Sequence, residues 1–130
     1  MYLQYCKIAL SSRLKILDRY TPLAYAKSVE LIETSIFTKQ INRLLDEKNY
    51  AEFREYLIFN PLKGKLIKGG GGIRKIRWKT KNAGKSGGVR IIYFIKTEVK
   101  IYLLCAYSKH EAESLSKRQV NMLAKVVNDL

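Results

Sequence analysis

The sequence predicts an α+β domain, with helices first, then a small antiparallel-rich sheet of about four strands, and a closing helix. Apolar residues follow a helical period before Pro61, alternate with polar residues between Ile73 and Tyr107, and return to a helical period after Ser116. With 130 residues and an apolar content of 47%, the chain suits one folded globular domain.

The first half of the chain predicts three helical segments and one strand. Apolar residues at helical spacing indicate an amphipathic first helix, which the Thr21-Pro22 pair ends or interrupts: Tyr2, Cys6, Leu10, Leu14 and Leu17. Residues 29–33 alternate like a short strand, and residues 35–45 return to a helical period. Asp46 is a suitable N-cap for a further helix that ends at Asn60-Pro61.

The second half predicts a meander followed by a helix. Residues 73–78, 89–95 and 99–107 are rich in branched and aromatic side chains and read as three strands. Their short connections favour antiparallel pairing. Ser116 to Gln119 form a possible capping box, and four apolar residues then share one helical face: Val120, Leu123, Val127 and Leu130.

The charge of the chain is strongly one-sided. Lys and Arg number 25 against 11 Asp and Glu, which gives +14 at neutral pH. Residues 61–110 hold 13 of the basic residues and a single acid, Glu98. These basic residues could simply form a solvated face, but so large and one-sided a positive charge favours binding to a polyanion. The chain has no apolar run long enough to span a membrane, and its amino end lacks a secretion-signal pattern, so we expect a cytoplasmic protein.

The sequence lacks the residue patterns of several common metal, nucleotide-binding and catalytic sites. Cys6 and Cys105 lie far apart, so neither a zinc site nor a disulfide framework is expected, and the sequence predicts no metal and no cofactor. Gly84-Lys85-Ser86 does not complete a nucleotide-binding loop, because a strand pattern follows it. The single histidine, His110, excludes a mechanism with two histidines.

Glycines and cations alternate with apolar residues in the predicted meander. Strand alternation places Lys75, Arg77 and Lys79 on one face and Ile76 with Trp78 on the other. The run Gly69 to Gly72 and the pair Gly87-Gly88 are either flexible turns or places where the backbone approaches a sugar-phosphate chain closely. Three aromatic residues belong either to the core or to base stacking: Trp78, Tyr93 and Tyr107.

From about Val29 onward the chain resembles the RelE superfamily of toxins, closest to its HigB-like branch. The segments that carry the resemblance are residues 33–38, 60–61, 68–78, 84–93 and 101–109. The resemblance implies a RelE-like toxin domain over residues 29–130. It also implies an endoribonuclease that cuts mRNA in the ribosomal A site, without a metal, through attack of the 2′-hydroxyl on the adjacent phosphate. A further implication is a cognate antitoxin with a helix-turn-helix unit. Residues 1–28 lie outside the resemblance, and they are either an additional helix or an upstream extension.

The resemblance also implies roles for individual residues. Arg77 and Arg90 would hold the phosphate, Lys75 or Lys109 would act as base, and His110 is a candidate proton donor. Six further residues are expected to bind RNA: Arg74, Lys79, Lys81, Lys85, Tyr93 and Tyr107. Many relatives carry a tyrosine shortly after the basic pair, where this chain has Ser114, Leu115 and Ser116, so Tyr93 or Tyr107 would replace it. The alternative function is a non-catalytic module that binds RNA or the ribosome.

Overall fold

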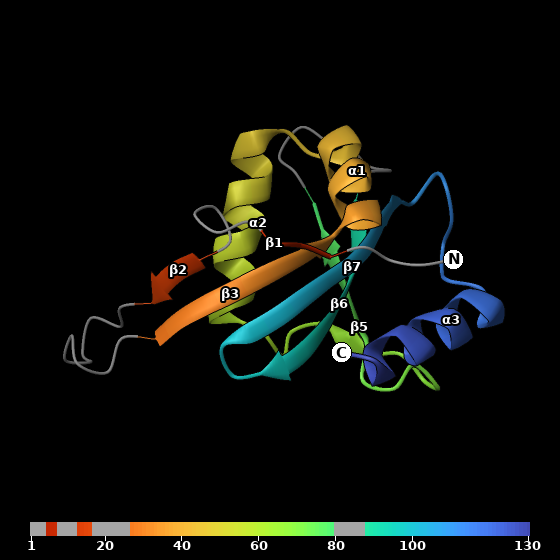
Figure 1. Cartoon of the computed structure of the whole chain (residues 1–130). Coiled ribbons are helices and arrows are strands. Elements are labelled where there is room, and N and C mark those ends of the chain that lie inside the picture. The colour runs from red at the N-terminus through yellow and green to blue at the C-terminus, as the bar shows by residue number, and fades with distance from the viewer. Residues whose placement is uncertain (1–4, 8–12, 17–26, 80–87) are drawn as a thin grey trace.

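The computed structural model describes residues 5–7, 13–16, 27–79 and 88–130, and it places three helices around one mixed sheet (Figure 1). The elements, in chain order, are β1 (Tyr5–Lys7), β2 (Arg13–Ile16), β3 (Lys27–Thr34), α1 (Ser35–Leu44), α2 (Glu47–Phe59), β4 (Lys65–Leu66), β5 (Arg74–Trp78), β6 (Val89–Thr97), β7 (Lys100–Ser108) and α3 (Lys117–Asn128). The strand order within these residues is β1-β3-β7-β6-β5-β4, and β2 also pairs with β3. The predicted α+β class is confirmed, but the expectation of about four strands is wrong.

The amino-terminal helix expected from apolar spacing is also wrong. β1 and β2 pair antiparallel with β3, with Tyr5 opposite Thr34 and Arg13 opposite Glu30. A spacing of four residues keeps side chains on one face of a strand as well as on one face of a helix, so the pattern did not discriminate between them. The backbone of β3 needs partners on both sides, and β7 supplies only one of them through a parallel pairing.

The helix ends follow the sequence signals. The Asp46 side chain accepts a hydrogen bond of 2.7 Å from the backbone N–H of Asn49 and begins α2. The predicted capping box of α3 is present, because Ser116 accepts from the Gln119 N–H at 3.1 Å and the Gln119 side chain accepts from the Ser116 N–H at 2.8 Å. These local bonds fix where two of the three helices start.

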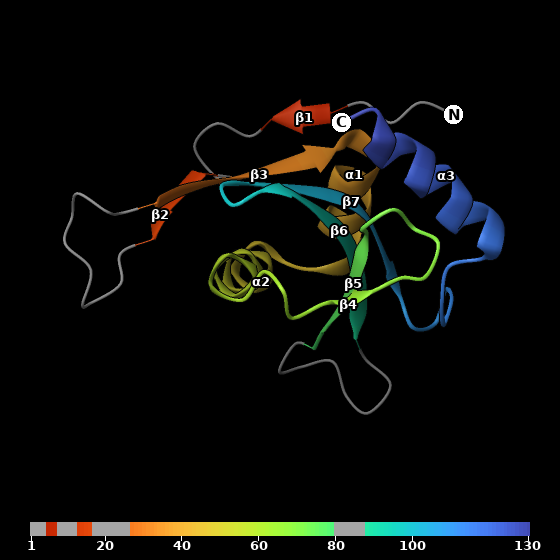
Figure 2. The ribbon, with the colours of Figure 1, turned by 90° about the horizontal axis from the view of Figure 1, so that it is seen from below.

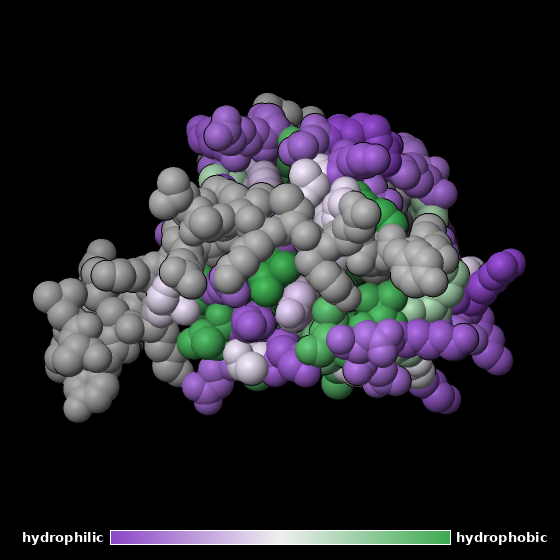
Figure 3. All heavy atoms as spheres, in the orientation of Figure 1, coloured by the Kyte–Doolittle hydropathy of each residue, from purple (hydrophilic) through white to green (hydrophobic). Residues whose placement is uncertain are grey.

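The two faces of the sheet carry separate apolar cores. Helices α1 and α2 cover one face, where Phe37, Phe53 and Leu57 pack against residues of β3, β6 and β7. Helix α3 covers part of the other face, where Leu123 and Val127 meet Ile92 and Leu104. Figure 2 shows α2 and α3 on opposite sides of the strands. Figure 3 shows hydrophilic residues over the upper ends of α1 and α2 and along α3, as expected for amphipathic helices. No helix among the described residues has the length and apolar character needed to cross a membrane.

The glycine run lies beneath α3. Gly71 and Gly72 have φ angles of +73° and +110°. A Cβ at Gly71 would lie 3.3 Å from Val127 Cγ2, and one at Gly72 would lie 3.0 Å from the Phe94 ring. These two glycines therefore allow the chain to turn and pack against α3, whereas the sequence left a close approach to RNA open for them.

Candidate nucleic-acid interface

A groove of about 690 Å³ runs along the outer side of β5. Six cationic side chains line it, together with three apolar or aromatic ones: Lys63, Lys65, Lys75, Arg77, Lys79 and Arg90, with Tyr56, Ile76 and Trp78. They come from α2, the turn after it, β4, β5 and β6. The groove thus collects a large part of the positive charge that the sequence concentrates in residues 61–110.

The strand β5 supplies the floor of the groove. As predicted, Ile76 is buried in the core beneath α2, and Lys75, Arg77 and Lys79 alternate with it. β4 pairs only with Arg74 and Lys75, so no described strand lies beyond the remaining residues of β5. At this open edge the side chains from both faces of β5 can reach the same groove.

Arg90 is the least exposed cation of the groove. It is 5% exposed, and within the sheet it lies opposite Arg77 on β5 and opposite Tyr107 on β7. Its Nη1 donates to the carbonyl of Gly88 at 3.3 Å. The described residues place no carboxylate in an ion pair with it. A buried guanidinium in this state is suited to bind an anion that enters the groove.

Gly88 lies where a side chain would disturb these cations. Its φ angle is +154°, and a Cβ there would lie 3.4 Å from Arg90 Nη1 and 3.8 Å from Arg77 Cγ. The sequence left open whether this glycine is a turn or allows close backbone approach. The structure puts it beside the basic residues, and as a glycine it adds no side chain of its own next to them.

Tyr107 on β7 lies in line with Arg90 on β6 and Arg77 on β5, across three neighbouring strands. It is 7% exposed, and its hydroxyl has no hydrogen-bond partner among the described residues. Burial raises the pKa of Tyr107, and the positive charge of Arg90 offsets part of this rise. The hydroxyl is therefore protonated at neutral pH and can donate a hydrogen bond near Arg90.

Lys109 and His110 lie at the end of β7 and do not line the groove. Both are exposed, and the Lys109 N–H donates to the Gly88 carbonyl at 3.3 Å, which brings its backbone to the entrance of β6. The next residue, Glu111, pairs with Arg43 of α1 at 3.0 Å. The hydrogen bond from Arg43 lowers the pKa of Glu111. This pair anchors the turn that carries Lys109 and His110.

Two of the expected RNA-binding residues have structural contacts instead. Arg74 donates from Nη1 to the carbonyls of Gly64 at 2.7 Å and Leu62 at 3.3 Å. Tyr93 is fully buried, donates to the Pro61 carbonyl and accepts from the Gly64 N–H at 3.0 Å. Both residues hold the turn that carries Lys63 and Lys65. The expected RNA-binding residues Lys81 and Lys85 lie outside the described residues.

Tyr56, Lys63 and Lys65 line the groove although the sequence does not predict them as site residues. Tyr56 lies on α2, for which the sequence predicts only a helix, and the two lysines lie in a turn and a two-residue strand that have no useful periodicity. The charge count was the available signal for the lysines. Within the described residues, no group of three His, Cys, Asp or Glu side chains could hold a metal ion.

The comparison with known families finds one match over the part of the chain that contains most of the groove. The sequence model of the family described as "RelE toxin of RelE / RelB toxin-antitoxin system" matches residues 62–130. This range includes all six cationic residues of the groove, from Lys63 to Arg90, together with α3.

Proposed function

Because the chain belongs to the RelE toxin family, we propose that it is the toxin of a type II toxin–antitoxin pair and that it cleaves translated mRNA in the ribosomal A site. The observation that carries this proposal is the buried Arg90, which lies opposite Arg77 in a groove with four further cations. The segments resembling the HigB-like branch favour a place in that part of the family. Action on the ribosome implies a cytoplasmic location.

The reaction needs little more than positioned charge and two proton transfers. The 2′-oxygen forms a bond to the adjacent phosphorus as its proton passes to a base, and the bond from phosphorus to the 5′-oxygen breaks as that oxygen takes up a proton. The products are a 2′,3′-cyclic phosphate and a free 5′-hydroxyl. Negative charge accumulates on the phosphate oxygens in the transition state, where fixed cations stabilise it most. We propose that the reaction needs no metal and no cofactor.

Arg77 and Arg90 are the groups that we assign to the scissile phosphate. Their opposed positions let two guanidinium groups reach one anion, and a guanidinium donates to phosphate through two parallel hydrogen bonds. Lys75 is our preferred base because it lines the same groove, two residues along the strand from Arg77.

The proton donor comes from the end of β7 in this proposal. His110 and Lys109 follow that strand, and the Lys109 backbone is bonded to Gly88 beside Arg90. Tyr107 is the alternative donor because its protonated hydroxyl lies near Arg90. Lys79 then holds a neighbouring phosphate of the RNA, without a chemical role.

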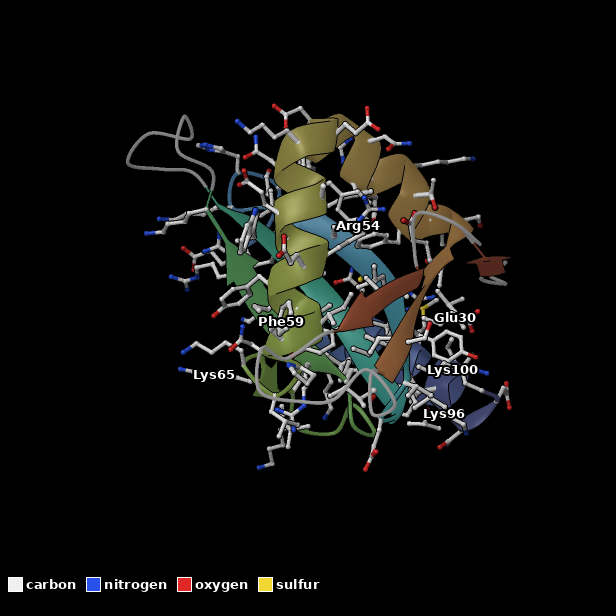
Figure 4. All side chains as sticks on the ribbon, turned by 90° about the vertical axis from the view of Figure 1, so that its left-hand side faces the viewer. Glu30, Arg54, Phe59, Lys65, Lys96 and Lys100 are labelled. Atoms are coloured by element: carbon white, nitrogen blue, oxygen red, sulfur yellow. The ribbon has the colours of Figure 1, made fainter. Side chains whose placement is uncertain are left out.

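The test is a translation reaction in which mRNA ends are mapped after the purified protein is added. We expect new ends within A-site codons, and we expect Arg90→Ala to abolish them. Lys96→Ala is the matched control, since Lys96 is an exposed lysine of the same strand that does not line the groove. Figure 4 shows Lys65 and Lys96 on opposite sides of α2. Ribosome binding without any new ends would favour the non-catalytic module.

The family also implies an antitoxin partner, and we propose that this partner carries a helix-turn-helix unit. A neighbouring reading frame should encode it. Co-expression of that frame should restore growth to cells that produce the toxin, whereas an unrelated helix-turn-helix protein should not.

A further inference from the structure

One wall of the groove is aromatic. Tyr56 of α2 and Trp78 of β5 both line it, and their ring centroids are 5.5 Å apart at an interplanar angle of 48°. Phe53 supports Trp78 from the core side in an edge-to-face arrangement, with the two ring centroids 5.5 Å apart. Tyr56 and Trp78 are each only partly buried. Their position is therefore held by the core while part of each side chain faces the groove.

The aromatic wall and the cations meet because the sheet has an open edge. Trp78 projects from the face of β5 that packs against α2, and Arg77 projects from the other face. β4 stops after Lys65 and Leu66, so the outer side of β5 from Ile76 onward has no described strand that would separate the two faces. Consecutive residues of one strand thus present an aromatic ring and a guanidinium to one cavity.

A bare phosphate would need only the cations of this groove. A single-stranded nucleic acid presents a phosphate and a flat base in each nucleotide, and proteins bind it with cations that follow the backbone and aromatic rings that stack on the bases. We propose that Tyr56 and Trp78 form a nucleobase subsite that binds a base of single-stranded RNA while Arg77 and Arg90 hold the adjacent phosphate. This inference rests on the proposed function, because it takes RNA as the ligand of the groove.

Trp78 is the only tryptophan of the sequence, so its fluorescence reports directly on the subsite. The probes are a 2′-O-methyl trinucleotide, which cannot undergo attack by a 2′-hydroxyl, and an abasic trinucleotide of the same charge. We expect the first to quench Trp78 fluorescence on binding, and we expect the second to bind more weakly without quenching. A poly-glutamate peptide tests the other macromolecule that a basic groove attracts.

Variants at Tyr56 separate stacking from apolar packing. Tyr56→Phe keeps the ring and should bind the trinucleotide like the wild type. Tyr56→Leu keeps apolar volume but has no ring, and loss of one stacking contact should weaken trinucleotide binding about 5- to 150-fold. Binding of the abasic probe should not change. Phe59→Ala is the control, because Phe59 is an exposed aromatic residue on the same helix that does not line the groove.

A second measurement uses ribosomes programmed with uncleavable mRNA that carries 2-aminopurine at one position of the A-site codon. Stacking in the subsite should quench the 2-aminopurine at one codon position, and Tyr56→Leu should abolish that quenching.

The inference is overturned if the base-containing and abasic probes bind equally, if Tyr56→Leu behaves like the wild type, or if poly-glutamate alone quenches Trp78. Cleavage of mRNA by such a protein would leave the proposed function intact. Absence of binding in both measurements together with absence of cleavage would overturn both.

Discussion

Arg77 on β5 and Arg90 on β6 are directly opposed in the register of the sheet, and Arg90 is only 5% exposed. Like charges in opposed positions destabilise a sheet, and a buried cation without an anionic partner adds to this cost. The described residues supply a carbonyl contact from Gly88 but no carboxylate ion pair for Arg90. The folded protein therefore holds an unfavourable arrangement that an anionic ligand would relieve.

This arrangement predicts that function and stability oppose each other at Arg90. Arg90→Met removes the buried charge and keeps an unbranched apolar side chain, so the free energy of unfolding should rise by about 1 kcal/mol at low salt. Cleavage should be lost. Inorganic phosphate should raise the melting temperature of the wild type more than that of the variant. Thermal unfolding with and without phosphate measures both effects, with Lys96→Met as control. A variant less stable than the wild type would contradict the argument.

Gly88 and Gly69 form a matched pair for testing the surface above the cations. Both have positive φ angles, +154° and +78°, but a Cβ at Gly69 would have no atom within 4 Å, whereas one at Gly88 would contact Arg90. Alanine at either position should cost about 1 kcal/mol of unfolding free energy through backbone strain. Only Gly88→Ala should also weaken RNA binding. The measurement is the RNA affinity of the two folded variants. Equal RNA affinities would show that Gly88 matters solely for the turn.

A buried carboxylate joins β3 to both helices on its face of the sheet. Glu33 is 2% exposed, and it accepts hydrogen bonds from the Thr38 hydroxyl at 2.6 Å and from the Tyr50 hydroxyl at 2.5 Å. Tyr50→Phe removes one of these charge-assisted bonds inside the core. We expect a loss of roughly 1.5–3 kcal/mol in the free energy of unfolding, measured by urea denaturation. A matched variant in an exposed pair, Arg43→Met, should cost far less.

The same tyrosine predicts an alkaline limit to stability. Burial, followed by the charge of Glu33, raises the pKa of Tyr50 well above its usual value of 10.0. A raised pKa in the folded state contributes stability that is complete below pH 10 and is lost as the pH rises further, because only the unfolded chain then ionises. Unfolding free energies measured from pH 8 to 11 should fall less steeply for Tyr50→Phe than for the wild type. Parallel curves would contradict this assignment.

Local signals in the sequence were sufficient for the parts of the fold that local bonds determine. Asp46 and the pair Ser116 and Gln119 begin α2 and α3 where the sequence predicts, and the strands β5 to β7 follow their alternation. Pairing between distant segments was not predictable in this way. Residues 5–7 and 13–16 are strands because the outer side of β3 accepts them, and their apolar spacing suited a helix equally well.

The candidate site was predicted in the same uneven manner. Alternation along β5 correctly grouped Lys75, Arg77 and Lys79, and it placed Ile76 in the core. The sequence predicts Tyr93 as an RNA-binding residue because its strand position gives no indication of the turn at residues 61–64, which covers its hydroxyl. Tyr56 reaches the groove because α2 packs beside Trp78 of β5, a relationship between elements that no local pattern contains.

Arg74 provides a last test, since it supports the groove without lining it. Its guanidinium holds the carbonyls of Leu62 and Gly64, and the turn between them carries Lys63 towards the groove. Arg74→Met should release Lys63 and Lys65 from their positions. Each phosphate contact with a single strand contributes about 0.7 to the slope of log K against log salt, so this slope should fall by about 1.4. The double variant Lys63→Ala with Lys65→Ala should give the same slope, and Arg74→Lys, which keeps one donor, should give an intermediate one. A slope unchanged in Arg74→Met, measured at a temperature where the variant is folded, would mean that the turn holds its lysines without Arg74.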